Sequence, residues 1–292
     1  MDPVVFWYAL NSVPGLGAVG MRRAVSVFGS PRGVLEAPPE ELVARGRLQP
    51  FQAYALGKIA ERLDALEAEL ASAQKDGVCL ILLGEPGYPG NLAETSDAPP
   101  LLYVRGSLLP TDSNGVALVG TRRPDARGLQ AARELAWALA RAGICVVSGL
   151  AVGIDGAAHR GALEAGGRTI AVLGSGVLRP YPWQHQALAS AVARQGALVS
   201  EVPLRARATT PTLMARNRLL AGLAKAVVVV QSRGTGGAPV TAKRALALGR
   251  PAYYLSRQRE PFKSGCRELE ALGAAAFDWP CDVAALAAAA QG

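Results

Sequence analysis

The sequence is poor in the residues on which metal binding and acid–base catalysis usually depend. It holds two histidines and four cysteines among 292 residues. No Cys-x-x-Cys pair and no Cys/His cluster has the spacing of a zinc site. Cys79 and Cys145 lie inside short apolar runs, where we expect both thiols to be buried as small hydrophobic groups. The sequence therefore predicts no metal site.

Long apolar runs are missing as well. None reaches the roughly 18–20 residues of a membrane-spanning helix, and the N-terminus lacks the pattern of a signal peptide. We therefore expect a cytoplasmic protein without a membrane partner. Aromatic residues make up only 5% of the chain, whereas half of all residues are hydrophobic. A composition rich in alanine, leucine, valine and glycine is typical of helices packed on a parallel sheet.

Residues 1–75 show helical patterns and no convincing strand, which predicts a small all-α domain. A long helix is expected from about Pro50 to Lys75. Its apolar face would carry Leu56, Ile59, Leu63, Leu66 and Leu70.

After Gly77, short apolar runs alternate with helical stretches. The predicted strands are Val78–Leu83, Leu101–Val104, Val116–Val119, Ile144–Ser148, Thr169–Leu173, Ala197–Ser200, Ala226–Val230 and Ala252–Leu255. The predicted helices are Gly128–Ala142, Gly156–Ala165, His185–Arg194, Leu213–Leu223 and Thr241–Leu248. This alternation predicts an α/β fold over residues 76–280, Rossmann-like and doubly wound, with a mostly parallel sheet. Residues 281–292 are expected to form a short tail.

Basic residues are unevenly distributed along the chain. Residues 1–75 hold eight basic and eight acidic residues, so the formal net charge of +8 arises from the remainder. From Arg205 to Lys263, twelve side chains are basic and only Glu260 is acidic. Such a concentration favours a polyanionic partner and salt-dependent binding, although a general bias toward basic residues would give the same excess. Arginine predominates, and its planar fork suits phosphate contacts and stacking on bases.

Four predicted strands end in glycine-rich turns that lead into helices. The turns are Gly120-Thr-Arg-Arg123, Ser148-Gly149, Gly174-Ser-Gly176 and Gln231-Ser-Arg-Gly-Thr-Gly-Gly237. Backbone N–H groups at a helix N-terminus can hold a phosphate. Asp155 is a plausible N-cap of the helix that follows the second turn. Four such turns on one sheet edge, with Arg122 and Arg233 beside them, predict a site for several phosphates in a row.

Two familiar nucleotide sites do not fit these turns. A dinucleotide site needs G-x-G-x-x-G and an acidic residue at the end of the next strand, whereas Gly174-Ser-Gly176 lacks the third glycine. No G-x-x-x-x-G-K-[ST] sequence occurs, which excludes a P-loop. We expect no cofactor.

Catalytic groups are not evident. His159 follows Asp155 by four residues, so we expect a local hydrogen bond between them, and His185 has no obvious nucleophile beside it. Glu201, after Ser200, is expected to accept hydrogen bonds from strand-end amides rather than to act in catalysis. Arg216-Asn-Arg218, at a predicted helix start, could clamp a phosphate.

Residues 78–275 resemble the DNA-processing protein A (DprA/Smf) family. The resemblance rests on these segments, in order: Pro99-Pro-Leu-Leu-Tyr-Val-Arg-Gly-Ser-Leu108, Val119-Gly-Thr-Arg122, Val147-Ser-Gly-Leu-Ala-Val-Gly-Ile-Asp-Gly-Ala-Ala-His159, Gly174-Ser-Gly176, Tyr181-Pro182, Gly196-Ala-Leu-Val-Ser-Glu201, Ala215-Arg-Asn-Arg-Leu-Leu-Ala-Gly222 and Val240-Thr-Ala-Lys243. It implies a cytoplasmic, non-catalytic binder of single-stranded DNA that protects incoming DNA during natural transformation and loads RecA onto it. It also implies a homodimer formed through the C-terminal half of the Rossmann-like domain.

The resemblance assigns Arg122 as the arginine of a basic pocket. The full set of expected DNA-binding residues is Gly120, Thr121, Arg122, Arg123, Ser148, Gly149, Gly174, Ser175, Gly176, Arg216, Asn217, Arg218, Arg233 and Lys243. Pro14-Gly-Leu-Gly17 resembles the hairpin of a helix–hairpin–helix, or SAM-like, domain, whose amides can contact a DNA backbone.

Several positions depart from the family pattern. Some members have lysine where Val152 stands, aspartate at Leu178, asparagine at His185 and glutamate at Gln231. We therefore expect affinity to depend more on Arg205, Arg207, Arg233 and Arg244. The winged helix that ends some members is not expected in residues 281–292.

Two other interpretations remain open. Thr235-Gly-Gly237 faintly resembles the glycine loop of LOG-type phosphoribohydrolases, which would make the chain a nucleotide-processing enzyme, but Ala238, Pro239 and Val240 stand where that family has its glutamate. A diverged paralogue with the same fold and another ligand is the other alternative.

Overall fold

The computed structural model describes residues 1–234, 236–256, 258, 260–279 and 282–291. Six helices occupy the first 75 residues: α1 (Pro3–Asn11), α2 (Ala18–Phe28), α3 (Pro31–Glu36), α4 (Pro39–Ala44), α5 (Pro50–Ala60) and α6 (Leu63–Lys75). Asp2 and Ser30 cap α1 and α3 by accepting hydrogen bonds from the Val4 and Gly33 amides. We call residues 1–75 the helical region.

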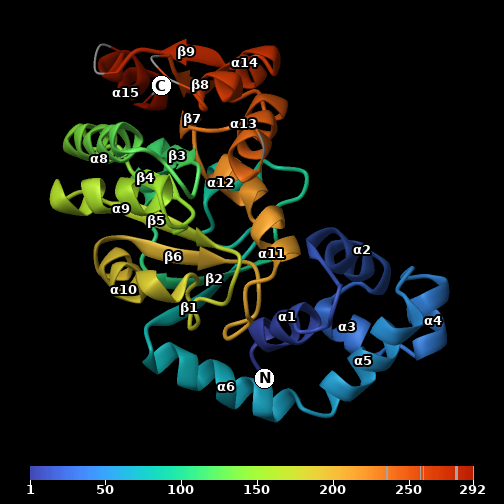
Figure 1. The fold of residues 1–292 in the computed structure, drawn as a ribbon. Helices are drawn as coiled ribbons and strands as arrows, with labels where there is room; N and C mark the ends of the chain where they lie inside the picture. The colour runs from blue at the N-terminus through green and yellow to red at the C-terminus, as the bar shows by residue number, and fades with distance from the viewer. Residues whose placement is uncertain (235, 257, 259, 280–281, 292) are drawn as a thin grey trace.

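The single helix expected from Pro50 to Lys75 is wrong, because α5 and α6 are separate. The chain leaves helical geometry at Arg62, with φ −119° and ψ 17°. The two helices have different partners: α5 packs on α1, α3 and α4, whereas α6 packs on α1 and strand β1. In Figure 1, α6 runs from the end of α5 to the sheet.

Nine strands form one sheet, in the order β1-β2-β6-β5-β4-β3-β7-β8-β9. Their bounds are β1 (Val78–Leu82), β2 (Leu101–Gly106), β3 (Val116–Gly120), β4 (Val146–Ser148), β5 (Thr169–Leu173), β6 (Ala197–Ser200), β7 (Ala226–Gln231), β8 (Ala252–Leu255) and β9 (Ala275–Phe277). All pairings from β6 to β9 are parallel, whereas β2 pairs antiparallel with both β1 and β6. The mostly parallel, doubly wound α/β sheet is confirmed.

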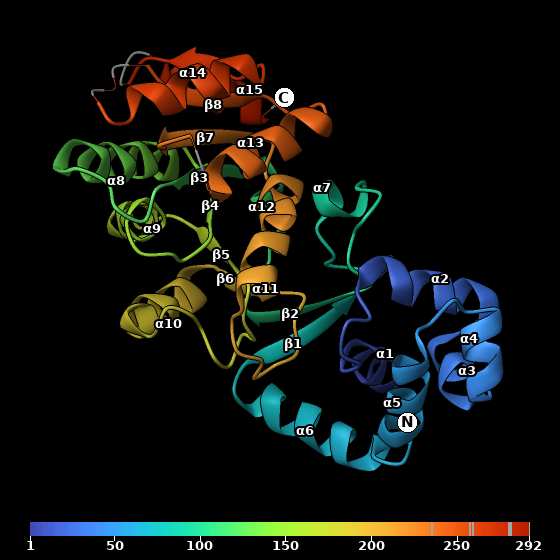
Figure 2. The same cartoon turned by 45° about the vertical axis from the view of Figure 1, so that its right-hand side comes forward.

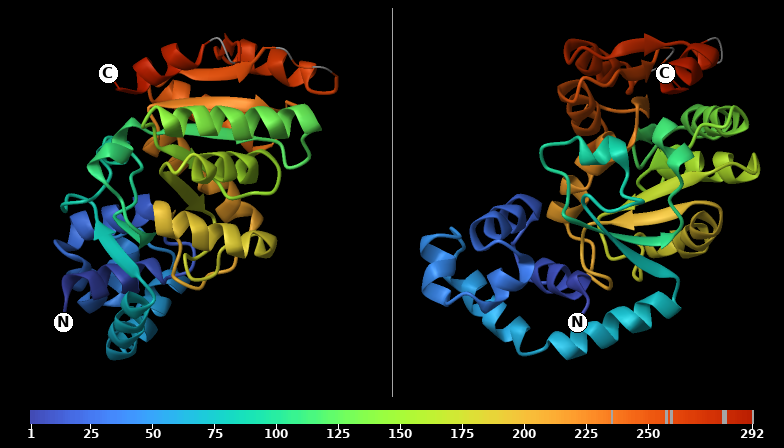
Figure 3. Two further views of the ribbon diagram at one scale, coloured as in Figure 1. Left: turned by 90° about the vertical axis from the view of Figure 1, so that its left-hand side faces the viewer. Right: turned by 180° about the vertical axis from the view of Figure 1, so that it is seen from behind.

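Helices cover both faces of this sheet (Figures 2 and 3). One face carries α8 (Ala126–Arg141), α9 (Ile154–Glu164), α10 (Gln186–Gln195) and α15 (Val283–Gln291). The other carries α7 (Gly90–Ala93), α12 (Asn217–Leu223), α13 (Gly237–Ala247) and α14 (Lys263–Ala271). Every residue of β7 is buried, because alternate valines pack on opposite layers.

Several elements differ from the prediction. Strand β9 and helices α7 and α14 were not expected. The helix expected over 213–223 is interrupted at Arg216, which separates α11 (Thr210–Ala215) from α12. Helix α11 begins earlier than predicted because Thr209 and Thr212 form a reciprocal capping box.

The helical region packs against the β2 side of the sheet. The core of α1–α6 is continuous with Leu101 and Tyr103 of β2 and with Leu173 and Leu198. The Tyr103 hydroxyl donates a hydrogen bond of 2.8 Å to the Asn11 side-chain oxygen. Its ring meets the Tyr8 ring edge-on, with centroids 6.0 Å apart. Within the described residues, no helix has both the length and the apolarity needed to cross a membrane.

Candidate functional site

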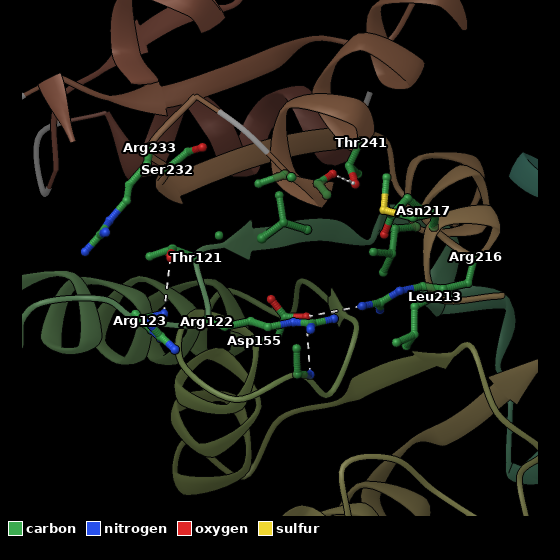
Figure 4. Close-up of a pocket in the computed structure, with 18 of the residues that line it drawn as sticks. Thr121, Arg122, Arg123, Asp155, Leu213, Arg216, Asn217, Ser232, Arg233 and Thr241 are labelled. Atoms are coloured by element: carbon green, nitrogen blue, oxygen red, sulfur yellow. Dashed lines mark hydrogen bonds and ion pairs between the residues drawn. The ribbon is translucent and has the colours of Figure 1, made fainter. Parts of the chain in front are cut away.

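A pocket of about 440 Å³ lies at the carboxyl ends of β3 and β7, where parallel α/β sheets usually bind ligands. Its walls come from the turns after β3, β4 and β7 and from helices α11, α12 and α13 (Figure 4). The lining residues are Val119, Gly120, Thr121, Arg122, Arg123, Ala151, Asp155, Thr210, Leu213, Met214, Arg216, Asn217, Leu220, Ser232, Arg233, Gly236, Gly237, Ala238 and Thr241. We call this the main pocket.

Three exposed arginines stand on the walls of the main pocket. Arg122 and Arg123 follow β3, and Arg233 follows β7. Within the described part of the chain, none of the three forms an ion pair with a carboxylate. The Arg233 guanidinium lies 5.6 Å from the centroid of the Phe262 ring. Three guanidinium groups therefore have no ion pair within the described residues, and the charge of Arg122 also acts on Asp155, where it opposes the rise that burial causes in the pKa of that carboxyl.

The N-terminus of α13 also opens into the main pocket. The helix starts at Gly237, after Gly236 with φ 102°, and both glycines line the pocket together with Ala238. The first amides of a helix have no partner within the helix and carry a partial positive charge. Backbone amides and guanidinium groups thus face the same space, which is a suitable arrangement for phosphate.

Gly120 ends β3 where no side chain fits. A Cβ atom there would lie 2.5 Å from Cγ1 of Ile154 and 2.8 Å from the Gln231 carbonyl oxygen. This close approach lets the turn after β3 pass beside α9, so that Arg122 and Arg123 emerge at the pocket wall. Gly120 is therefore needed for close packing, and it also lines the main pocket.

Arg216 lies at the back of the main pocket, where it is paired with Asp155. Their side chains are 7% and 5% exposed, and Nη2 of Arg216 lies 3.7 Å from Oδ2 of Asp155. The same carboxylate oxygen accepts hydrogen bonds from the Gly149 and Ala151 amides, and Nη1 of Arg216 donates to the Val172 carbonyl at 2.9 Å. Asp155 is therefore not the N-cap of α9, which is Gly153.

Burial dominates the electrostatics of this pair. It raises the pKa of the Asp155 carboxyl above its ordinary value, while Arg216 and the two amides act in the opposite direction. It also lowers the pKa of the Arg216 guanidinium, against the attraction of Asp155. Gly149 is required beside the pair, since a Cβ there would lie 1.4 Å from Nη1 of Arg216. Arg216 joins α12 to β4, β5 and α9.

The turn after β5 is filled by the chain itself. A Cβ on Gly174 would meet Leu213 at 2.9 Å, and one on Gly176 would meet the Leu204 carbonyl at 2.1 Å. The Gly176 amide donates to the Ala206 carbonyl at 2.9 Å, and Ser175 is buried. Gly174, Ser175 and Gly176 therefore do not line the main pocket. Ser148 is also buried, and its hydroxyl donates to the Leu118 carbonyl at 2.6 Å.

Arg218 is bound by acidic groups rather than exposed in the main pocket. Its guanidinium donates to the Glu201 carboxylate and, at 2.7 Å, to the Asp97 carbonyl. The expectation that Glu201 satisfies strand-end amides is therefore wrong. Burial raises the pKa of Glu201, and the Arg218 charge acts against that rise. Asn217, in contrast, lines the main pocket beside Gly237, although it is 4% exposed.

The other basic side chains lie outside the main pocket. Lys243 is exposed on α13 and is not among the lining residues. Arg244 forms an ion pair with Asp97 at 2.6 Å, and its charge is therefore neutralised within the fold. Arg205 and Arg207 are exposed elsewhere, and Arg205 lies 3.9 Å from Asp76. Of the four arginines expected to strengthen binding, Arg233 alone lines this pocket.

Two further expectations are corrected. His159 does not bond to Asp155; its Nδ1 lies 2.7 Å from the Thr169 hydroxyl oxygen, and the ring is fully buried. Cys145 is buried as predicted, but Cys79 is exposed on the edge strand β1. Within the described residues, no group of three or more His, Cys, Asp or Glu side chains is arranged to hold a metal ion.

Sequence reasoning missed the apolar wall of the main pocket, which Leu213, Met214 and Leu220 form. The predicted helix over 213–223 already contained these three residues, but no local pattern places them beside β3. Gln231 is buried at the end of β7, and its side-chain amide donates to Asp125 at 3.0 Å. An amide can make this contact, whereas a glutamate would repel Asp125.

Comparison with known proteins identifies the family. The sequence model of DNA recombination-mediator protein A matches residues 79–287. The chain belongs to this family. It is 34% identical over 271 residues to protein Smf of Synechocystis, covering 90% of this chain and 67% of that protein.

Two solved structures of family members resemble the fold. DNA processing protein A (DprA) of Streptococcus pneumoniae superposes with a TM-score of 0.76 at 27% identity, covering 94% of this chain and 95% of that one. DNA processing protein A of Helicobacter pylori gives a TM-score of 0.65 at 28% identity, covering 72% and 95%. The latter structure is described as giving insight into a single-stranded DNA binding mode.

Proposed function

We propose that this chain binds single-stranded DNA at the main pocket. The observation that supports this most strongly is the set of Arg122, Arg123 and Arg233, which line the main pocket together with the N-terminus of α13 and form no ion pair with a carboxylate of the described residues. An exposed arginine without a partner contributes little to the fold, but it can bind a phosphate in a two-pronged manner. Family membership and the H. pylori relative support the same ligand.

The shape of the main pocket favours a single strand over a duplex. Its arginines and amides lie beside an apolar wall of Leu213, Met214 and Leu220. A single strand can place phosphates on the polar side and turn an unstacked base toward the apolar side, whereas bases in a duplex stay paired and stacked. Affinity should therefore be higher for single-stranded DNA.

We propose the family role for the bound strand. In this role the protein is a cytoplasmic, non-catalytic recombination mediator of natural transformation. It protects incoming DNA and loads RecA onto it, acting as a homodimer formed through the C-terminal half of residues 76–280. Residues 1–75 form a separate SAM-like domain in this proposal. The description of the matching family as a recombination mediator supports it.

Nucleotide hydrolysis is a weaker alternative. Among the described residues that line the main pocket, Asp155 carries the one carboxylate, and it is held by Arg216 and two backbone amides. Ala238 stands at the start of α13, where the phosphoribohydrolase pattern has its glutamate region. The residues at the pocket are better suited to holding an anion than to abstracting a proton.

The test is the affinity of the Arg122→Ala variant for dye-labelled oligothymidine, measured by fluorescence anisotropy against a duplex of equal length. We expect affinity to fall about ten- to a hundredfold, since a charge-assisted hydrogen bond is worth about 1.5–3 kcal/mol and about 1.4 kcal/mol is a factor of ten. The melting temperature should not change. Arg141→Ala, which removes an exposed arginine from the end of α8, is the matched control. Unchanged affinity in Arg122→Ala would contradict the assignment of the pocket.

A further inference from the structure

Two exposed aromatic rings lie on the turn between β5 and α10. Tyr181 is 45% exposed and Trp183 is 76% exposed. Neither ring has an aromatic or cation–π partner among the described residues. Single exposed aromatic residues are common on protein surfaces, but these two rings are separated by one residue and lie at the sheet edge that carries the main pocket. A pair of such rings therefore indicates a surface that another molecule covers.

The turn that carries these rings is firmly attached to the sheet. His185 is 6% exposed, and its Nδ1 lies 2.8 Å from the Leu150 carbonyl oxygen in the turn after β4. The His185 amide donates to the Pro182 carbonyl at 3.0 Å, and Pro182 is itself buried. The backbone around Trp183 is thus anchored on both sides, so that both rings are presented from a rigid support.

A small pocket connects this turn with the main pocket. It has a volume of about 130 Å³, and its lining includes Arg122, Gly149, Val152, Tyr181 and Leu213. Arg122 and Leu213 line both pockets, and Figure 4 shows both beside Asp155 and Arg216. The strands β5, β4, β3 and β7 are consecutive neighbours in the sheet. Shared lining residues therefore link Tyr181 in the small pocket to Arg122, and Arg122 to the start of α13 in the main pocket.

Basic side chains accompany the aromatic rings. Arg179 precedes Tyr181 by two residues and is exposed. Arg160 is exposed on α9, where its Nη1 and the His185 ring border the same face of Gly156. Aromatic rings interleaved with arginines are typical of surfaces that bind single-stranded nucleic acid, because the arginines hold phosphates and the rings stack on bases.

We propose that Tyr181 and Trp183 form a base-stacking extension of the main pocket. A strand whose phosphate is held at Arg122 continues over the small pocket, and its following bases stack on the Tyr181 and Trp183 rings. This inference rests on the proposed binding of single-stranded DNA and adds a second, uncharged set of contacts to it. Because every base has a flat face, these contacts recognise bases without selecting among them.

The experiment compares two probes of equal length, labelled oligothymidine and an oligomer with the same sugar–phosphate backbone but no bases. Trp183→Ala should lower the affinity for oligothymidine about fivefold or more and leave the affinity for the abasic oligomer unchanged. Trp183→Phe should retain most of the affinity, since a ring remains. The slope of affinity against salt should equal that of the unmodified chain, because no charge is removed.

Trp137→Ala is the matched control, because Trp137 is also exposed, at 47%, but lies on α8 away from both pockets. If the unmodified chain binds oligothymidine and Arg122→Ala weakens it, while Trp183→Ala and Tyr181→Ala bind both probes like the unmodified chain, the stacking inference alone is overturned. If the unmodified chain does not bind oligothymidine, the proposed function fails as well. Equal losses for both probes would also overturn stacking, since they would indicate a phosphate contact or misfolding.

Discussion

The two halves of the sheet's carboxyl edge both carry glycines and arginines, but their structures differ. At the ends of β3 and β7, Arg122, Arg123 and Arg233 surround an open pocket and have no carboxylate partner among the described residues. At the ends of β5 and β6, Arg218 is bound by Glu201 and Asp97, Gly176 packs against residues 203–206, and Gly174 packs against Leu213. We call these the open half and the filled half; Arg216 lies between them.

This difference shows that an arginine is available to a ligand only when it has no partner within the fold, so its presence in the sequence is not enough. Twelve basic residues lie between Arg205 and Lys263. Arg216, Arg218 and Arg244 form ion pairs with acidic residues, and Arg250 donates to the carbonyls of Ala221, Gly222 and Ala224 near the end of α12. These four side chains stabilise the fold, so the charge available to DNA is smaller than the sequence suggests.

The largest effect is expected from replacing Arg216, which lies between the open half and the filled half. Arg216→Met keeps the volume but leaves the Asp155 carboxylate buried without its cation, which costs about 3–5 kcal/mol of unfolding free energy. Urea unfolding followed by circular dichroism measures this loss. The double variant Arg216→Met/Asp155→Asn should recover part of it, because the orphaned charge is gone. A loss below about 0.5 kcal/mol, as expected for the exposed Arg141→Ala, would mean that the pair does not hold the two halves together.

A second, smaller effect is a pH dependence of stability that arises from His159 on α9, which bonds to Thr169 at the start of β5. Burial, reinforced by the charges of His185, Arg216 and Arg160, lowers the pKa of His159 to about 3. The unfolded value is about 6.5, so the unfolded chain binds more protons between these values. The stability from neutral His159 is therefore fully present above pH 6.5 and is lost as the pH falls toward 3. Between pH 7 and pH 5 the loss is about 2 kcal/mol.

His159→Gln should remove most of this dependence, since glutamine does not titrate and can still bond to Thr169. Urea midpoints of both proteins at pH 7 and pH 5 measure the difference. An equal drop in the two proteins would show that His159 is not the group that titrates.

Most strands of the sheet could be predicted from the sequence, because a buried strand is a short run of apolar residues. The bounds of β5, β6 and β8 agree with the structure, since each is a short apolar run that turn residues or helices enclose. Strand β9 was missed because it has three residues, of which Ala275 and Ala276 are exposed. The break between α5 and α6 was missed because one apolar periodicity runs through both helices, and only their different partners separate them.

The site could be predicted only in part. The strand-end glycines and Arg122 were evident from local patterns, and the structure brings Gly120, Thr121, Arg122, Arg123, Arg216, Asn217 and Arg233 together. The ion pairs that Arg218 and Arg244 form with acidic residues could not be predicted from local patterns. Their shared partner Asp97 lies more than a hundred residues earlier in the chain, and only the folded structure places it there.

The most direct test of the central claim is the salt dependence of binding to single-stranded DNA. Each phosphate contact contributes about 0.7 to the slope of log affinity against log salt concentration for single strands. Replacing Arg122, Arg123 and Arg233 together by alanine should therefore reduce the slope by about 2, with little change in the melting temperature. A variant with the slope of the unmodified chain would contradict the claim that the open half binds the DNA backbone.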